Sequence, residues 1–187
     1  MGKIISVETY FLGDIHSWPS ISKFHFNKQE GGGALFEMGC HHIDLLSYCM
    51  GNVKSVKATI ESSALETIDD KAEVNLEFQN GAIAKSHVSW VSSIPKYELS
   101  ITGEKGEITI KDEDFYLYLK DKLVFRLGPL QLRLDRAKSN YQRELLYFGK
   151  CIRDDVPPKP GINDAVENMK IITAAYESSR LEKSIEL

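Results

Sequence analysis

Between residues 53 and 127, apolar and polar residues alternate, and this pattern constrains the fold more than any other feature of the sequence. In residues 56–61 and again in residues 73–78, every second side chain is apolar. Successive side chains of a β-strand point to opposite faces, so each segment predicts a strand with one buried face. Asn80-Gly81 then favours a tight turn between the second of these strands and residues 82–91. The middle of the chain therefore predicts a mostly antiparallel sheet with one packed and one uncovered face.

Apolar residues spaced three and four positions apart predict three helices outside this region. The first follows Gly31-Gly32-Gly33 and runs to about Met50, where Gly51 favours a helix end. Two more carry the stripes Tyr141, Leu145, Phe148, Ile152 and Ala165, Met169, Ile172, Tyr176, with Asn140 and Asn163 as expected N-caps. Further strands are expected at residues 3–11, 95–102, 107–111, 115–120 and 123–127. Together these elements predict an α+β fold, a mostly antiparallel open-faced β-sheet with helices packed on one face.

Chain length and charge limit both the organisation of the protein and its partners. The 187 residues suffice for one substantial domain over residues 1–187. A formal net charge of −4 gives no electrostatic basis for binding nucleic acid or an anionic membrane, and no apolar run has the length of a membrane span. Cys40, Cys49 and Cys151 are widely spaced and odd in number, which indicates neither a disulfide framework nor a cysteine zinc site and predicts a cytoplasmic location.

The glycine triplet and the residues after it form the strongest candidate site. Glu37 and His41 are four positions apart, so on a helix they share a face, and Asp44 lies three positions beyond His41. A carboxylate beside an imidazole fixes the imidazole tautomer and raises its basicity, as a general acid or base requires. The glycines would let another molecule or another backbone come close. The structural alternative is a solvated helix whose start is merely marked by glycines.

Other candidates carry weaker signals. Glu37, His41, His42 and Asp44 offer metal ligands, but the two histidines are adjacent and no HExxH pattern is present, so we predict no metal site. A long irregular segment over residues 13–30 is typical of a functional loop. Its polar and aromatic residues are candidates for a substrate pocket, namely His16, Trp18, Lys23, His25 and Lys28. No glycine fingerprint for a dinucleotide follows a strand anywhere in the chain.

The run GGGALFEMGCHHIDLLSYCMG resembles the signature that opens the C-terminal domain of the Gfo/Idh/MocA oxidoreductases. Residues 101–108 are similar to a sheet hairpin of that family, and residues 141–187 resemble its closing helices and last short strand. Residues 2–7 resemble the point where the family's second domain begins. The resemblance spans nearly the whole chain and is most specific in the glycine–His–Asp run.

This resemblance implies a divided enzyme. Family members hold NAD or NADP, and a catalytic lysine, on an N-terminal Rossmann domain, which we expect to be absent from this chain. The second domain supplies the sugar or polyol site, and by position His41 would transfer the proton. We expect the loop residues Trp18 and Lys23, together with Asp44, to bind substrate. Glu37 occupies the place of the usual aspartate. This is a departure, because one added methylene displaces the carboxylate and catalysis is sensitive to shifts of about 1 Å.

Three hypotheses follow. The first is the C-terminal domain of an NAD(P)-dependent sugar, polyol or related carbonyl oxidoreductase, inactive alone. The second is a non-enzymatic binding or oligomerisation module that kept the fold, which the change at Glu37 and the missing Rossmann half favour. The third, a metal-dependent hydrolase or isomerase that uses Glu37 and His41, has the least support. We also expect a homodimer or higher oligomer through the uncovered sheet face, because a broad half-apolar face seldom stays exposed to water.

Overall fold

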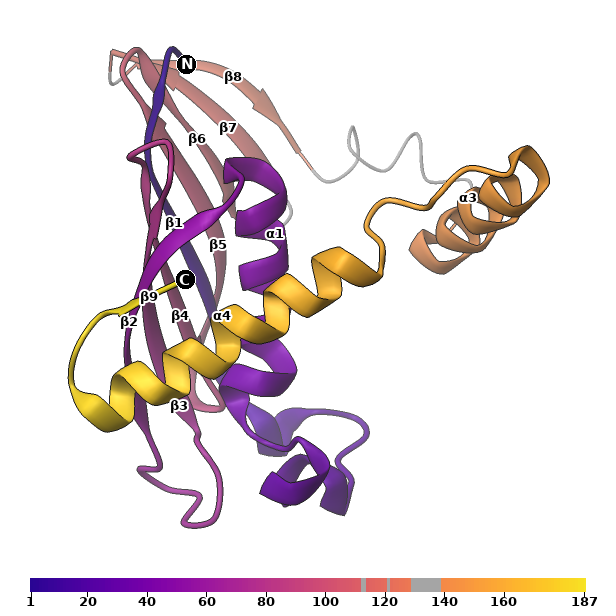
Figure 1. Ribbon diagram of the computed structural model, residues 1–187. Helices are drawn as coiled ribbons and strands as arrows, with labels where there is room; N and C mark the ends of the chain where they lie inside the picture. The colour runs from indigo at the N-terminus through magenta and orange to yellow at the C-terminus, as the bar shows by residue number, and fades with distance from the viewer. Residues whose placement is uncertain (112–113, 121, 129–138) are drawn as a thin grey trace.

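A computed structural model describes residues 1–111, 114–120, 122–128 and 139–187. Its described strands form one nine-stranded sheet in the order β8-β7-β6-β5-β1-β4-β3-β2-β9 (Figure 1). Neighbouring strands are antiparallel, except that β1 and β4 run parallel. The strands are β1 (Ile4–Asp14), β2 (Val53–Glu61), β3 (Lys71–Phe78), β4 (Ile83–Ser89), β5 (Val91–Gly103), β6 (Gly106–Lys111), β7 (Asp114–Leu119), β8 (Lys122–Leu127) and β9 (Ile185–Glu186).

The predicted α+β class and the mostly antiparallel sheet are confirmed. The β3–β4 hairpin turns at Asn80-Gly81, where the positive φ of Gly81, 83°, is the backbone conformation that favours glycine. Asn80 stabilises the turn, since its Oδ1 accepts a hydrogen bond of 2.9 Å from the backbone N–H of Ala82. Each predicted strand is present, with ends that differ from the expected bounds by a few residues.

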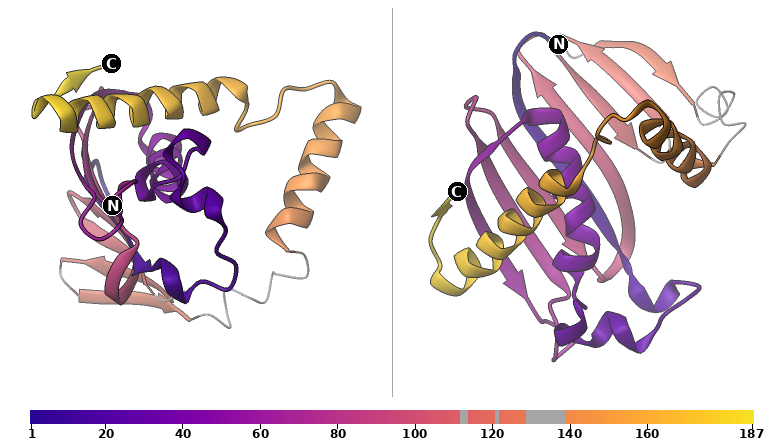
Figure 2. Two further views of the ribbon diagram at one scale, coloured as in Figure 1. Left: turned by 90° about the horizontal axis from the view of Figure 1, so that it is seen from below. Right: turned by 45° about the vertical axis from the view of Figure 1, so that its right-hand side comes forward.

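Two helices cover one face of the sheet (Figures 1 and 2). Helix α1 (Cys40–Met50) and helix α4 (Ile162–Leu181) pack on each other, and both contribute to the core. The core joins alternate strand residues to helix residues, including Val56, Val74, Leu76, Phe78, Ile43, Leu46, Ile172 and Ala175. This contact explains the period-two pattern, because every second strand residue lies beneath the helices.

Helix α3 (Asn140–Asp154) does not cover the sheet and lies apart from it in both Figure 1 and Figure 2. Its apolar stripe remains exposed, with 79% of Tyr141, 71% of Leu145 and 68% of Ile152 accessible. A hydrogen bond of 2.9 Å from the backbone N–H of Lys159 to the Tyr147 hydroxyl ties the helix to the loop that follows it. The prediction that the helices pack on one face of the sheet therefore holds for α1 and α4 but not for α3.

Both N-cap predictions are also wrong. Ser139 caps α3, because its Oγ accepts a hydrogen bond of 3.2 Å from the N–H of Gln142, and the Gln142 side chain accepts one from the N–H of Ser139. Asn140 already lies within the helix. Helix α4 begins after Gly161, whose N–H donates to the Asp164 carboxylate at 2.6 Å. In each case a neighbouring residue in extended conformation is the cap, as cap geometry requires.

The uncovered sheet face is more polar than expected. On it, Glu8 accepts hydrogen bonds from Tyr10 (2.7 Å) and from His87 (3.0 Å), and His87 lies 3.6 Å from Glu73. The rings of Tyr10 and His87 stack at 4.5 Å, and the Lys96 ammonium lies 3.0 Å from the centre of the Tyr10 ring. These strand residues pair with one another across the sheet. The expectation of a half-apolar face is therefore wrong in this region.

No described helix has the length and apolar character needed to cross a membrane.

Candidate active site

The glycine triplet opens a π-helical turn, η4 (Leu35–Gly39), which leads directly into α1. Asp69, on the loop before β3, holds the first residue of this π-helical turn in place through a hydrogen bond. Its Oδ2 accepts a hydrogen bond of 2.7 Å from the N–H of Leu35, and its Oδ1 accepts one of 2.9 Å from the Tyr176 hydroxyl on α4. Sequence reasoning missed both the π-turn and Asp69. Single π-turns inside helices are rare and frequently lie at functional sites.

The glycines accommodate the chain's own backbone. A Cβ on Gly32 would lie 2.7 Å from the carbonyl oxygen of Phe24 and collide with that of His25. A Cβ on Gly33, where φ is +125°, would collide with the Asp69 carboxylate. The prediction that the glycines let another backbone come close is confirmed, and that backbone belongs to the loop over residues 13–30. This loop contains three short 3₁₀ turns, η1 (Ile15–Ser17), η2 (Lys23–Phe26) and η3 (Lys28–Glu30).

Glu37 pairs with this loop. Nδ1 of His25 lies 2.7 Å from each of the two Glu37 carboxylate oxygens, and the two side chains are only 14% and 20% exposed. Trp18 and Trp90 meet the His25 ring edge-on, each with ring centres 6.3 Å apart. A carboxylate and an imidazole thus form a dyad with aromatic walls, which sequence reasoning assigned to a different histidine.

The predicted contact between Glu37 and His41 is not formed. Among the described residues, none makes a hydrogen bond or ion pair with the side chain of His41, which is exposed. The prediction assumed α-helical spacing, but a π-turn has more than four residues per turn, so two residues four apart lose their alignment. The longer glutamate side chain instead reaches His25 across the loop.

His41 faces a different hollow. Together with Asp44 it lines a space of about 260 Å³ between α1 and α4, which we call the α1–α4 hollow. Pro160, Ala165 and Asn168 form its opposite wall. No described residue forms a hydrogen bond or ion pair with the Asp44 carboxylate. The structure therefore brings two predicted site residues, His41 and Asp44, to one hollow and places Glu37 with His25.

His42 has a structural environment. Its Nδ1 lies 3.0 Å from the Thr9 hydroxyl and 3.1 Å from the Ser86 hydroxyl, beneath α1. Burial, with a smaller contribution from His41, lowers the pKa of His42 from 6.5 to about 4. A largely buried, neutral imidazole held by two hydroxyls has a structural role, in contrast to the exposed imidazole of His41.

The two predicted substrate-binding residues of the loop differ. Trp18 is half-buried and packs edge-on against Trp90, with ring centres 5.9 Å apart, beside the His25–Glu37 pair. Lys23 has an exposed side chain on η2. The described residues contain no group of three or more His, Cys, Asp or Glu side chains placed to hold a metal ion.

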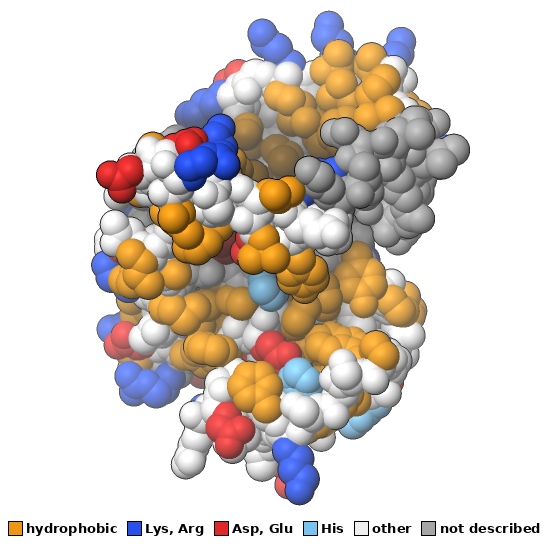
Figure 3. All heavy atoms as spheres, turned by 90° about the vertical axis from the view of Figure 1, so that its right-hand side faces the viewer, with side chains coloured by type: hydrophobic (Ala, Val, Ile, Leu, Met, Phe, Trp, Pro, Cys, Tyr) orange, Lys and Arg blue, Asp and Glu red, His pale blue; other side chains and the backbone are white. Residues whose placement is uncertain are grey.

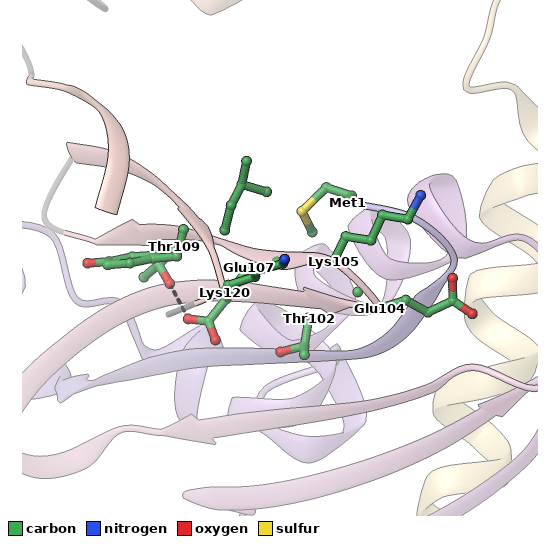
Figure 4. Close-up of a pocket in the computed structure, with 11 residues that line it drawn as sticks. Met1, Thr102, Glu104, Lys105, Glu107, Thr109 and Lys120 are labelled. Atoms are coloured by element: carbon green, nitrogen blue, oxygen red, sulfur yellow. Dashed lines mark hydrogen bonds between the residues drawn. The ribbon is translucent and has the colours of Figure 1, made fainter. Parts of the chain in front are cut away.

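A larger hollow lies elsewhere. It measures about 990 Å³ and opens at the end of the sheet, where the β5–β6 hairpin meets the chain start and residues 118–120 (Figure 4). Its polar side chains spread along the strand ends, and the Thr109 hydroxyl donates a hydrogen bond of 2.8 Å to the Glu107 carboxylate. None of the predicted site residues lines it.

The side of the molecule that carries α3 and the start of α4 has a mixed character. Figure 3 shows that apolar side chains cover much of this side, with histidine and acidic side chains set among them. Exposed apolar residues include Phe24, Phe36, Leu45, Leu145, Ile162 and Val166. Exposed apolar side chains therefore make up much of this side of the molecule.

Comparison with known proteins agrees with this fold. The sequence profile of the GFO/IDH/MocA C-terminal domain matches residues 1–109. The uncharacterized oxidoreductase YrbE of Bacillus subtilis (strain 168) is 28% identical over 165 residues, which cover 79% of this chain and 46% of YrbE. The chain thus spans about half the length of this relative.

Solved structures share the fold at lower identity. Levoglucosan dehydrogenase in complex with NADH and levoglucosan has a TM-score of 0.82 at 20% identity, over 100% of this chain and 59% of that one. Aldose–aldose oxidoreductase from Caulobacter crescentus, complexed with glycerol, has a TM-score of 0.81 at 20% identity, over 100% and 56%. The resemblance of the glycine–His–Asp run is confirmed, and the chain belongs to the Gfo/Idh/MocA family, with the fold of its C-terminal domain.

Proposed function

We propose that this chain is the substrate-binding and proton-transfer half of an NAD(P)-dependent oxidoreductase that acts on a sugar, a polyol or a related carbonyl compound. The observation that carries this proposal is the family's glycine–His–Asp run, folded so that His41 and Asp44 line one hollow. The names of the structural relatives support the substrate class, since they include a levoglucosan dehydrogenase and an aldose–aldose oxidoreductase. In this proposal residues 1–187 form one domain.

The described residues do not fit a dinucleotide. Glycines can let a pyrophosphate approach the backbone closely. Here the backbone of Phe24 and His25 occupies the space beside Gly32, and the Asp69 carboxylate occupies the space beside Gly33. We therefore assign NAD or NADP to a separate domain, which would supply the redox step. The function proposed for this chain is limited to binding the substrate and moving its hydroxyl proton.

Proton transfer is assigned to His41. An imidazole can exchange a proton near neutral pH, and the His41 ring is exposed and free of protein hydrogen bonds among the described residues. Asp44 is assigned to substrate hydroxyl groups, because its carboxylate lines the same hollow and is also unpaired. Trp18 is assigned to the apolar face of a sugar ring, and Lys23 to substrate contact from the loop.

We assign Glu37 to a dyad with His25. An Nδ1–H donated to the carboxylate leaves Nε2 of His25 as the free nitrogen. This pairing also supports the alternative function, a binding or oligomerisation module without turnover, because it removes Glu37 from His41. We further propose a homodimer through the sheet face and a cytoplasmic location.

The test joins this chain to an NAD(P)-binding domain of the family and measures reduction of NAD or NADP with a panel of sugars and polyols. We expect reduction by the joined protein and none by this chain alone. Trp18→Ala and Asp44→Asn should raise KM, with Lys57→Ala on the opposite sheet face as the matched control. A folded joined protein that binds the cofactor but reduces it with no member of the panel would support the binding module instead.

A further inference from the structure

Asn168 of α4 connects the two helices beside His41. Its Nδ2 donates a hydrogen bond of 3.0 Å to the carbonyl oxygen of Cys40, the residue before His41. The partners are 128 positions apart in the sequence, so only the packing of α4 on α1 brings them together. The contact also fixes the orientation of the amide, because the atom that faces a carbonyl oxygen must be the NH₂ group.

The other end of this amide has no partner. Oδ1 of Asn168 is buried and accepts no hydrogen bond from any described residue. Leaving a buried acceptor unpaired costs about 1–3 kcal/mol, so such groups are rare and require an explanation. Rotation of the amide does not remove the problem, since it would bring two oxygens together at Cys40.

The α1–α4 hollow offers one candidate donor. The Cys40 thiol already donates to the carbonyl of Glu37 at 3.2 Å. The N–H of Gly161 donates to Asp164 at 2.6 Å, and that of Ala165 to Gly161 at 3.2 Å. The carboxylate of Asp44 has no proton to give, and Pro160 has no N–H. Among the described residues that line the hollow, the remaining side-chain N–H is on the His41 ring.

We propose that Asn168 is the positioning residue for His41. A ring N–H of His41 donates to Oδ1 of Asn168, which fixes one tautomer and leaves the other ring nitrogen as the acceptor for a substrate proton. The His41 side chain is exposed and has no hydrogen-bond partner among the described residues, so its ring can rotate toward Asn168 in the unliganded chain. In this arrangement Asn168 orients the His41 ring, a role that the sequence spacing predicted for Glu37. The inference rests on the proposed function, since positioning matters only if His41 moves a proton.

The experiment measures the ¹⁵N chemical shifts of His41 in the uniformly labelled chain, which report the population of each ring tautomer. We expect one dominant tautomer in the wild-type protein. Asn168→Leu removes the acceptor and should return His41 to the mixture of a free imidazole. Asn163→Leu, an exposed position on the same helix, is the matched control and should change nothing.

Two results would overturn the inference. One is a wild-type His41 that already has the tautomer mixture of a free imidazole, a measurement that needs no variant to fold. The other is a folded Asn168→Leu protein whose His41 tautomers match the wild type. Neither result depends on turnover, so the proposed function is tested separately by the joined protein. An active joined protein with a freely tautomeric His41 would remove the positioning contact and leave the function intact.

Discussion

Acidification should first lower the stability of the folded protein through protonation of His42, at pH values above those at which its carboxylates are protonated. The His42 pKa is about 4 in the folded protein, against 6.5 as the ordinary value, so the unfolded chain binds the proton more tightly. The contribution of His42 to the free energy of unfolding is therefore fully present above pH 6.5 and is lost as the pH falls toward 4. The shift corresponds to about 3 kcal/mol in total, of which about 2 kcal/mol is lost between pH 7.5 and pH 5.

This pH window separates His42 from the acidic residues. The pKa values of Glu8, Asp70 and Glu73 are lowered in the folded protein, so their contributions are lost only as the pH falls below their ordinary values of 4.5, 3.8 and 4.5. The other histidines are common to the wild type and a His42→Gln variant, so their effects cancel in the difference between the two proteins. The slope of that difference isolates His42.

The assay is urea unfolding of both proteins at several pH values from 7.5 to 5. Wild-type stability should fall by about 2 kcal/mol more than that of His42→Gln. The variant is expected to be the less stable protein at pH 7.5, because it disturbs the contacts to Thr9 and Ser86. Parallel stability profiles over this pH range would refute the assignment of His42 as a buried neutral imidazole.

Three further predictions concern packing and pairing. Ser178→Ala should destabilise the protein by about 1–3 kcal/mol in urea unfolding, because the buried Ser178 hydroxyl accepts from the N–H of Ala58 and donates to the carbonyl of Lys183; a loss no larger than that of the exposed Thr173→Ala would contradict this. Gly32→Ala should cost about 1–3 kcal/mol through its clash with the loop, whereas Gly149→Ala, whose Cβ meets nothing, should cost none. A double-mutant cycle of His25→Ala and Glu37→Gln should give a coupling of about 1–3 kcal/mol, and a cycle of His41→Ala and Glu37→Gln should give almost none; the reverse order would favour the pair that the sequence spacing indicates.

Local patterns were sufficient to predict the sheet. The alternation at Val74 and Leu76 follows from burial of one face, and the turn at Asn80-Gly81 follows from backbone preference, so both are readable without the fold. The central position of β1 in the sheet could not be predicted from the sequence. Its parallel pairing with β4 joins Thr9 to Ser86 across most of the sheet-forming region, and no local pattern encodes such a contact.

The candidate site was predicted in composition but not in its pairing. Spacing of four placed Glu37 beside His41, but the π-turn removed that alignment, and loop geometry supplied His25 instead. Asp69 and Asn168 act across 34 and 128 positions, distances at which spacing carries no information. Ser139 was missed because two capping residues are adjacent and only the backbone conformation decides between them.

The central claim is that His41 is the proton-transfer group of this half of the enzyme. The most direct test compares kcat/KM of the joined two-domain protein with those of His41→Ala and of His87→Gln, which alters a histidine on the opposite sheet face. Loss of a general acid or base should lower turnover by roughly 10²–10⁴-fold in His41→Ala and leave His87→Gln close to the wild type. An unchanged kcat/KM in a folded His41→Ala protein would contradict the account.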